Sequence, residues 1–217
     1  MNTQNPARAA SADRPGRAAG AAQGLARAFP VAPGELDALR GQLAAAARRD
    51  GILDIAYRTI DSPVGSLLLA ATEQGLIRVA YASEGHDAVL QALADRISPR
   101  VLHAPARLDA AARELGEYFA GRRHRFDVPL DLRLAAGFRR IVLSHLPEIG
   151  YGHTATYATV AQLAGHPRAS RAVGTACATN PLPVVVPCHR VIRADGSLGG
   201  YVGGPAAKRT LLTLEAS

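Results

Sequence analysis

The period of the apolar residues changes along this chain, and that change restricts the fold more than any other feature. Between residues 52 and 82, apolar side chains alternate with polar or small ones, or run uninterrupted, and both patterns are typical of β-strands. Thr72–Gly75 separates two expected strands, 67–71 and 77–81, and is predicted to form a hairpin turn. From about residue 86 the apolar residues recur at helical spacing. A sheet followed by helices is therefore expected.

Two helices are expected directly after the strands, at 86–97 and at 108–119. Packed on one side of the sheet, they would complete a small α+β domain. The remaining predicted helices cover residues 138–145, 157–163, 168–178 and 205–215. The middle two flank Gly165-His166-Pro167 and resemble a helix-turn-helix, a pattern that ordinary packed helix pairs share.

The predicted fold class is α+β, with a small N-terminal sheet-and-helix domain over 51–130 and a mostly helical domain over 131–217 that contains the helix-turn-helix. Residues 1–50 are predicted to be a basic extension, disordered or partly helical. Its first 32 or so residues are mainly Ala, Arg, Gly and Pro, which cannot bury enough apolar surface to offset the entropy of ordering. An organellar transit peptide is the alternative interpretation. Residues 36–47 show helical spacing.

The net charge of the 217 residues is +7, and Lys208 is the only lysine. A basic balance favours polyanionic partners, although a coding bias toward arginine and alanine would produce the same composition. The two cysteines, Cys177 and Cys188, form neither a disulfide framework nor a cysteine-rich zinc site. No apolar run approaches the roughly 20 residues that a membrane span needs. A soluble, cytoplasmic protein is expected.

One short segment concentrates reactive side chains. Val184–Val186 is predicted to be a buried strand or wall, which Pro187 ends, and Cys188, His189 and Arg190 follow it directly. The thiolate is the reactive form of cysteine, and nearby basic or cationic groups help to produce it. His189 could accept the thiol proton directly or through a water molecule. A buried thiol beside a structural histidine is the alternative.

Further motifs surround this segment in a fixed order. They are Thr156-Tyr157, Ser170-Arg171-Ala172-Val173-Gly174, Asn180-Pro181-Leu182-Pro183, Pro187-Cys188-His189-Arg190-Val191, Gly199-Gly200-Tyr201-Val202-Gly203-Gly204 and Leu211-Leu212-Thr213-Leu214-Glu215. Through them, residues 138–215 resemble the O6-alkylguanine-DNA alkyltransferase family. Residues 52–82 resemble the variable N-terminal domain of that family more loosely.

The resemblance implies a chemical role for each catalytic position. Cys188 would be the nucleophile and the permanent acceptor of the alkyl group. His189 would deprotonate it through a water molecule, and Glu215 would hold the imidazole, as in a Ser-His-Asp triad with sulfur as the nucleophile. Asn180 would tie the helix-turn-helix to the active-site turn. An Asx turn before Pro181 is its alternative role, compatible with the first.

The resemblance also implies how the alkylated base is held. The hydroxyl of Tyr157 would donate a hydrogen bond or a proton to N3 of guanine, and the backbone amide of Val202 would donate a hydrogen bond to O6. The carbonyls of Cys188 and Val191 would accept from the exocyclic amine, and Tyr201 would form one wall of the pocket. Tyr81 and Tyr118 are interpreted as half-buried core residues, and His86, His103 and His124 as surface residues.

The implied partner is double-stranded DNA carrying O6-alkylguanine, with O4-alkylthymine as a second candidate lesion. The base must be extruded from the duplex, and Arg171 matches the arginine that fills the vacated space. Ala172 and Gly174 would keep the helix slim enough for a minor groove, with Tyr157 also at the DNA. No cofactor is expected, and no metal is expected because relatives with an N-terminal zinc site use cysteines that this chain lacks. We further expect that the protein does not bind a membrane and has no obligate protein partner. It is expected to be a monomer, and cooperative clustering on DNA is an open alternative.

Two other classes of function remain as alternatives. One is a DNA-binding protein that only flags alkylated bases, in which the reactive cysteine is replaced; Cys188 is present here. The other is a cysteine hydrolase, which would pair its cysteine with a distant histidine and an oxyanion hole and would turn over repeatedly. Stoichiometry separates the three, since they transfer one alkyl group, none, or many.

Overall fold

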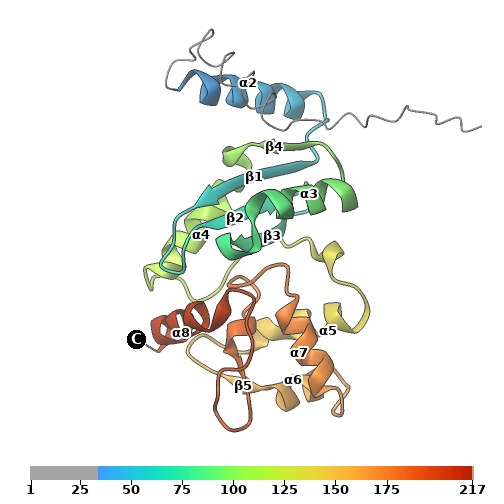
Figure 1. Ribbon diagram of the computed structural model, residues 1–217, viewed down its shortest axis with the longest axis vertical. Coiled ribbons are helices and arrows are strands. Elements are labelled where there is room, and N and C mark those ends of the chain that lie inside the picture. The colour runs from blue at the N-terminus through green and yellow to red at the C-terminus, as the bar shows by residue number, and fades with distance from the viewer. Residues whose placement is uncertain (1–33, 217) are drawn as a thin grey trace, which may run out of the picture. The chain divides into compact units, whose positions relative to one another are not determined.

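A computed structural model describes residues 34–216, and the chain divides into two units between Arg40 and Gly41. The segment expected to be a disordered tail or transit peptide, about residues 1–32, lies outside the described residues. Helix α2 (Glu35–Arg49) covers the positions where the apolar spacing predicted a helix. The second unit contains every candidate site residue, and its strands and helices confirm the α+β class (Figure 1).

The sheet contains β1 (Ile55–Ile60), β2 (Leu67–Ala71), β3 (Leu76–Tyr81) and β4 (Val101–His103), in the order β3-β2-β1-β4. Strands β1 and β2, and β2 and β3, pair antiparallel, so the predicted hairpin is confirmed. Strand β4 pairs parallel to β1, with Ile55 opposite Val101. The sequence did not predict β4, because three residues are too few to display an alternation.

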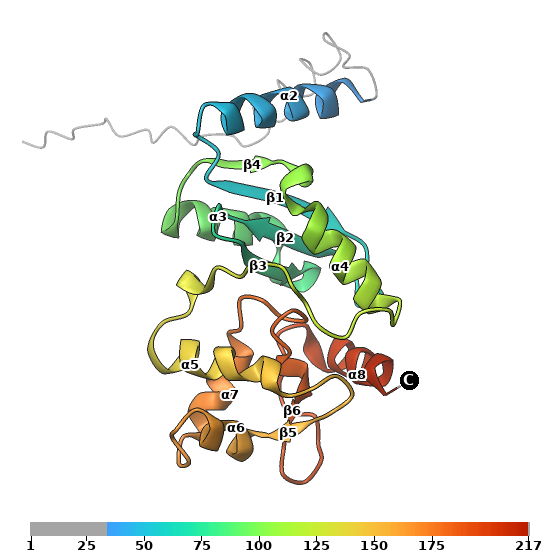
Figure 2. The same cartoon turned by 180° about the vertical axis from the view of Figure 1, so that it is seen from behind.

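Helices α3 (His86–Arg96) and α4 (Asp109–Phe119) lie on opposite faces of this sheet, as the two views in Figures 1 and 2 show. The prediction that both helices pack on one side was therefore wrong. Leu68 belongs to one core cluster with Val89 and Leu93 of α3, whereas Leu69 belongs to another with Leu115 of α4. All residues of β2 are buried, so the strand has two apolar faces and both need a cover.

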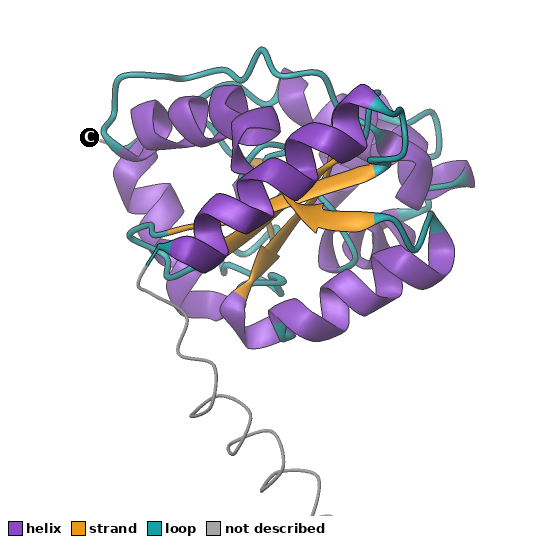
Figure 3. Cartoon of the chain, turned by 90° about the horizontal axis from the view of Figure 1, so that it is seen from above, coloured by secondary structure: helices purple, strands orange, loops and turns teal. Residues whose placement is uncertain are grey.

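The helical region holds the predicted elements almost where the apolar spacing placed them. Its helices are α5 (Gly137–His145), α6 (Tyr157–Leu163), α7 (Ser170–Ala178) and α8 (Gly204–Glu215), and its short parallel strands are β5 (Ala155–Thr156) and β6 (Val191–Ile192). Short 3₁₀ helices are η1 (Ala82–Glu84), η2 (Pro105–Leu108), η3 (Leu132–Leu134), η4 (Leu146–Glu148) and η5 (Cys188–Arg190). Figure 3 gives the view from above, with helices in purple and strands in orange. Among the described residues, no helix is long and apolar enough to cross a membrane.

Helices α6 and α7 form the helix-turn-helix. The hydroxyl of Thr156 accepts a hydrogen bond from the amide of Thr159 at 3.1 Å, which caps the start of α6. At the other end, Gly165 adopts a φ of 74°, a left-handed conformation that suits glycine and ends the helix. The sequence therefore defines both ends of the first helix locally.

Strand β3 connects the sheet to the helical region. The amide of Val79 donates to the carbonyl of Pro181 at 2.9 Å, and the Arg78 guanidinium donates to the same carbonyl at 3.2 Å. Arg78 also forms an ion pair with Glu84. The edge of the sheet is thus bonded directly to the segment that precedes the candidate nucleophile.

Candidate active site

The turn before Cys188 is built from buried valines. Val184, Val185 and Val186 are 1%, 6% and 1% exposed, which fits the predicted wall, but they form a turn rather than a strand. Val184 has a φ of 72°, in the left-handed region where a β-branched residue is strained. The chain then enters η5, which carries Cys188, His189 and Arg190 on a single turn.

Asn180 fastens this turn to the end of α7. Its side-chain nitrogen donates to the carbonyl of Val186 at 2.8 Å and to the sulfur of Cys188 at 3.1 Å. Its side-chain oxygen accepts from the amide of Leu182 at 3.0 Å, which is an Asx turn. Asn180 is 1% exposed, so both roles considered for it from the sequence are present in the same buried side chain.

His189 and Glu215 are also brought together. The distance between His189 Nε2 and Glu215 Oε1 is 2.8 Å, and the two residues are 0% and 4% exposed. Nδ1 of His189 is buried and has no hydrogen-bond partner among the described residues. Within the same residues no hydrogen bond joins the imidazole to the thiol of Cys188, so the route of the proton through a water molecule fits the geometry better than direct transfer.

Two residues that the sequence did not assign share the carboxylate of Glu215. Arg190 donates to it twice, from Nε to Oε2 at 2.8 Å and from Nη2 to Oε1 at 3.0 Å. Tyr118 donates from its hydroxyl to Oε1 at 2.6 Å. Tyr118 is 0% exposed, so it is not the half-buried core residue that was predicted. Arg190 could have been suspected from its place next to His189, but Tyr118 lies 97 residues from Glu215 and gave no local signal.

The charges of this cluster follow from burial and pairing. Burial alone would raise the pKa of Glu215, but hydrogen bonds from His189 and Arg190 lower it to about 2, so the carboxylate is ionised. Burial lowers the pKa of His189 despite its bond to Glu215, which favours the neutral imidazole. Burial also raises the pKa of Cys188 to about 11, although Asn180 and Lys208 oppose the shift. Cys188 is therefore a protonated thiol at neutral pH, and a base would be needed to ionise it.

Lys208 was another residue without a predicted role. It is 0% exposed, and its ammonium group donates to the carbonyl of Val191 at 2.6 Å and to the carbonyl of Leu198. The carbonyl of Cys188 accepts from the amide of Val191. Both carbonyls expected to bind the exocyclic amine of guanine therefore have one partner already, and each keeps a second lone pair.

Tyr157 lies at the start of α6 against the loop that contains Tyr201. A Cβ atom on Gly199 would lie 2.6 Å from the Tyr157 hydroxyl, and one on Gly174 would lie 3.9 Å from its ring. Gly199 has a φ of 65°, so both the backbone conformation and the close approach require glycine there. Burial raises the pKa of Tyr157, which keeps its hydroxyl protonated and able to donate.

A residue of the sheet holds Tyr201 in position. Its hydroxyl lies 2.9 Å from the hydroxyl of Tyr81 on β3, and the two rings pack edge to face with centroids 5.9 Å apart. A Cβ atom on Gly203 would lie 2.5 Å from the ring of Tyr81. Tyr81 is 3% exposed, so it too is more deeply buried than predicted. Like Tyr118 of α4, it contacts the candidate site from the sheet-and-helix region, across a sequence separation that hides the contact.

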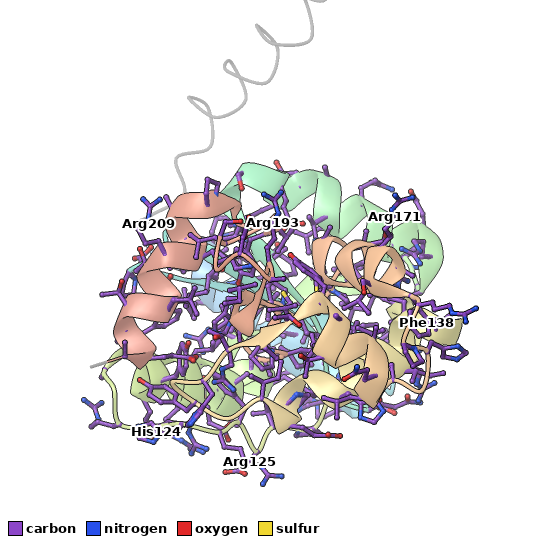
Figure 4. All side chains as sticks on the ribbon, turned by 90° about the horizontal axis from the view of Figure 1, so that it is seen from below. His124, Arg125, Phe138, Arg171, Arg193 and Arg209 are labelled. Atoms are coloured by element: carbon purple, nitrogen blue, oxygen red, sulfur yellow. The ribbon has the colours of Figure 1, made fainter. Side chains whose placement is uncertain are left out.

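The predicted DNA-contacting residues lie on α7. Arg171 and Ala172 are exposed, and Gly174 is half-buried. Within residues 34–216 the side chain of Arg171 forms no hydrogen bond or ion pair, and it projects from the face of the molecule drawn in Figure 4. Of the three histidines expected at the surface, His124 is exposed and stacks on Tyr151 with ring centroids 4.0 Å apart, whereas His86 and His103 are half-buried.

Known protein families match both parts of the second unit. A family described as "6-O-methylguanine DNA methyltransferase, ribonuclease-like domain" matches residues 55–132, and "6-O-methylguanine DNA methyltransferase, DNA binding domain" matches residues 137–217. The methylated-DNA–protein-cysteine methyltransferase of Mycolicibacterium paratuberculosis is 42% identical over 161 residues, which are 74% of this chain and 92% of the relative. That of Mycobacterium bovis is 43% identical over 169 residues, 75% of this chain and 93% of the relative.

Solved structures give the same result. A crystal structure of Mycobacterium tuberculosis O6-methylguanine methyltransferase aligns with a TM-score of 0.66 at 40% identity, covering 75% of this chain and 93% of that protein. A crystal structure of Mycobacterium tuberculosis OGT in complex with DNA aligns with a TM-score of 0.63 at 41% identity, covering 74% and 92%. The sheet-and-helix region and the helical region are therefore similar to these proteins in fold as well as in sequence.

Proposed function

Because this chain belongs to the 6-O-methylguanine DNA methyltransferase family, we propose that it repairs DNA by direct reversal, as a methylated-DNA–protein-cysteine methyltransferase. It transfers the alkyl group of an O6-alkylguanine to Cys188 and keeps it there, so each molecule acts once. The observation that carries the proposal is the buried cluster in which Asn180 contacts the thiol of Cys188 and Glu215 holds the adjacent imidazole.

The transfer begins with the proton of the Cys188 thiol, which passes through a water molecule to Nδ1 of His189. Glu215 stabilises the imidazolium that results, and the Asn180 amide stabilises the thiolate. The sulfur then attacks the alkyl carbon, a new S–C bond forms, and the bond from that carbon to O6 breaks. The electron pair of that bond stays with guanine.

The guanine anion must be neutralised as it leaves. Tyr157 hydrogen-bonds or protonates N3, and the amide of Val202 donates to O6. The second lone pairs of the Cys188 and Val191 carbonyls accept from the exocyclic amine, while Tyr201 packs against the base. The donors to N3 and O6 stabilise negative charge that develops only in the transition state, which is where hydrogen bonds accelerate a reaction, whereas the two carbonyls and Tyr201 hold the base in place.

The DNA side of the proposal uses α7. Arg171 enters the base stack when the damaged nucleotide is extruded, and the small residues Ala172 and Gly174 let α7 approach the minor groove, with Tyr157 beside the DNA. Double-stranded DNA containing O6-alkylguanine, and O4-alkylthymine as a second lesion, is the partner. The protein acts as a cytoplasmic monomer without a cofactor. Residues 131–217 carry the chemistry and the DNA contacts, residues 51–130 support them, and residues 1–50 are an extension.

Intact-mass measurement tests the proposal most directly. The protein is incubated with a duplex that carries a single O6-methylguanine, and digestion then locates any added methylene group. We expect one methylene per protein molecule, on the peptide that contains Cys188. The matched control is Cys177→Ala, which removes the other cysteine and should still be labelled, whereas Cys188→Ala should bind the duplex without being labelled.

Other outcomes of this measurement would support one of the alternative functions. Binding without any mass gain in the wild-type protein would make it a protein that flags alkylated bases. Repair of many equivalents of lesion per molecule would make it a multiple-turnover enzyme such as a cysteine hydrolase. Label on Cys177 would overturn the assignment of the nucleophile.

A further inference from the structure

We propose that Tyr118, on helix α4 of the sheet-and-helix region, is a positioning residue that keeps His189 neutral by competing with it for the carboxylate of Glu215. This inference rests on the proposed function, since it concerns the base that activates Cys188. It gives the N-terminal region a part in setting the charge state of the base, beyond structural support.

The contacts place three donors on one oxygen. Glu215 Oε1 accepts from Tyr118 at 2.6 Å, from His189 at 2.8 Å and from Arg190 at 3.0 Å. The Tyr118 hydroxyl also lies 3.4 Å from Nε2 of His189. A carboxylate oxygen that accepts several hydrogen bonds disperses its charge among them, so each donor weakens the attraction available to the others.

Tyr118 is held firmly in this position. It is 0% exposed, and its ring packs against Phe119 and Phe126 with centroids 5.3 Å away and against Tyr151 at 6.1 Å. Burial, together with the adjacent charge of Glu215, raises the pKa of Tyr118, so its hydroxyl keeps the proton and remains a donor. The hydroxyl cannot swing away, because the surrounding rings confine it.

Other polar and charged groups also surround His189 and Glu215. They are Arg190 and Cys188 of η5, Tyr151 and the amide of Gly152 before β5, Tyr201 of the loop before α8, and Lys208 of α8. The positive charges of Arg190 and Lys208 lower the pKa of His189 in the same direction as burial. Among the described residues, Tyr118 is the neutral side-chain donor that reaches Glu215 and also lies beside the imidazole.

A neutral His189 is what the proposed transfer needs. An imidazole that already carries a second proton cannot accept the one from Cys188. Without Tyr118, the carboxylate would attract a proton on the imidazole more strongly and would raise the pKa of His189. The tyrosine therefore extends the pH range over which His189 can act as a base, toward the acidic side.

The test uses the full chain with Tyr118→Phe, which removes one oxygen atom and keeps the ring. The first readout is the titration of the His189 ring nitrogens by NMR in the free protein, assigned by difference from His189→Gln. The second is the pH at which the single-turnover rate with O6-benzylguanine falls to half on the acidic side. We expect both midpoints to rise by about half a pH unit or more, the size of shift that neighbouring groups commonly produce.

Tyr151→Phe is the matched control. It removes a hydroxyl from the same aromatic cluster, but that hydroxyl donates to the backbone carbonyl of Leu214 at 3.1 Å and not to Glu215. We expect both midpoints to stay where they are in the wild-type protein. Thermal unfolding of both variants separates a local electrostatic effect from a general loss of structure.

Several outcomes would overturn the inference. They are unchanged midpoints in a folded Tyr118→Phe protein, a fall in either midpoint, or a uniform loss of rate without a shift. An imidazolium ring at neutral pH in the wild-type protein would overturn it without any variant. The NMR titration needs no alkyl transfer, so it tests the role of Tyr118 even in a protein that transfers nothing. A wild-type protein that transfers no alkyl group would contradict the proposed function and leave the inference about Tyr118 to be decided by the titration.

Discussion

The side-chain amide of Asn180 donates both to the sulfur of Cys188, at 3.1 Å, and to the carbonyl of Val186, at 2.8 Å. One buried group therefore holds the shape of the turn and, by donating to the sulfur, lowers the pKa of Cys188 against the effect of burial. Asn180 lies just after α7, the helix that is expected to contact DNA, so a single side chain joins the C-terminal end of that helix to the sulfur of Cys188.

Replacing Asn180 with Ala should slow transfer and also destabilise the turn. A hydrogen bond to a charged group contributes about 1.5–3 kcal/mol, so we expect a loss of roughly tenfold or more in the single-turnover rate. The pKa of Cys188, about 11 in the wild-type protein, should rise further. The pH dependence of iodoacetamide labelling, measured in a Cys177→Ala background, reports that pKa. An unchanged labelling profile would show that the Asn180 contact does not stabilise the thiolate.

Gly199 and Gly200 offer a matched pair of substitutions beside Tyr157. A Cβ atom on Gly199 would meet the Tyr157 hydroxyl at 2.6 Å, whereas one on Gly200 would have nothing within 4 Å. Gly199→Ala also forces a side chain into a φ of 65°, which costs about 1 kcal/mol. We expect Gly199→Ala to slow transfer from both DNA and free O6-benzylguanine, and Gly200→Ala to slow neither. Equal rates for the two variants would argue against a role for Tyr157 at the base.

Local patterns predicted most of the secondary structure and the reactive segment. The hairpin at Thr72–Gly75 and the helices α6 and α7 were predictable because turn residues and apolar spacing act over a few positions. The motifs around Cys188 were visible because they are contiguous. Strands β5 and β6 were not predicted, since they have two residues each and exist only through their pairing with one another.

Contacts between distant segments could not be predicted. Tyr81 and Tyr118 looked like ordinary core residues, but their hydroxyls bond Tyr201 and Glu215 across the junction of the sheet and the helical region. The run of valines at 184–186 has high β-propensity, yet it forms a turn because the hydrogen bonds of Asn180 hold it there. In each case tertiary contacts determine the role, and a single sequence does not display them.

Glu215→Gln should weaken His189 as a base. The amide carries no charge to stabilise the imidazolium, so the pKa of His189 should fall and the rate at neutral pH should drop. At high pH the thiol of Cys188, with its pKa of about 11, ionises without a base, so the rate with O6-benzylguanine should approach that of the wild-type protein. A loss of the same factor at every pH would mean that Glu215 only supports the fold.

The same substitution should change the acid stability of the protein. The pKa of Glu215 is lowered from 4.5 to about 2, so the ionised carboxylate stabilises the folded state above about pH 4.5, and this contribution disappears as the pH falls toward 2. Glu215→Gln leaves Arg190 buried without its ionic partner, and we expect lower stability at neutral pH. The difference in unfolding temperature from the wild-type protein should shrink on acidification. A difference that is constant with pH would contradict this.

Arg171 allows base extrusion to be separated from chemistry. Extruding a stacked nucleotide costs a few kcal/mol, and a side chain that fills the vacated space offsets part of that cost. Each 1.4 kcal/mol corresponds to about tenfold in rate, so Arg171→Ala should slow repair of duplex DNA by roughly tenfold or more. The reaction with free O6-benzylguanine needs no extrusion and should stay close to the wild-type rate.

The matched control for this comparison is Arg125→Ala. It removes the same charge from an exposed arginine that lies at the opposite edge of the face drawn in Figure 4. We expect it to change neither rate by more than a small factor at moderate salt, because surface charges far from the contact are screened. If Arg171→Ala lowered the rate by the same factor on both substrates, Arg171 would support the structure of the pocket instead of base extrusion. If Arg171→Ala and Arg125→Ala repaired duplex DNA at the same rate, Arg171 would contribute only its positive charge and would have no specific role in extrusion.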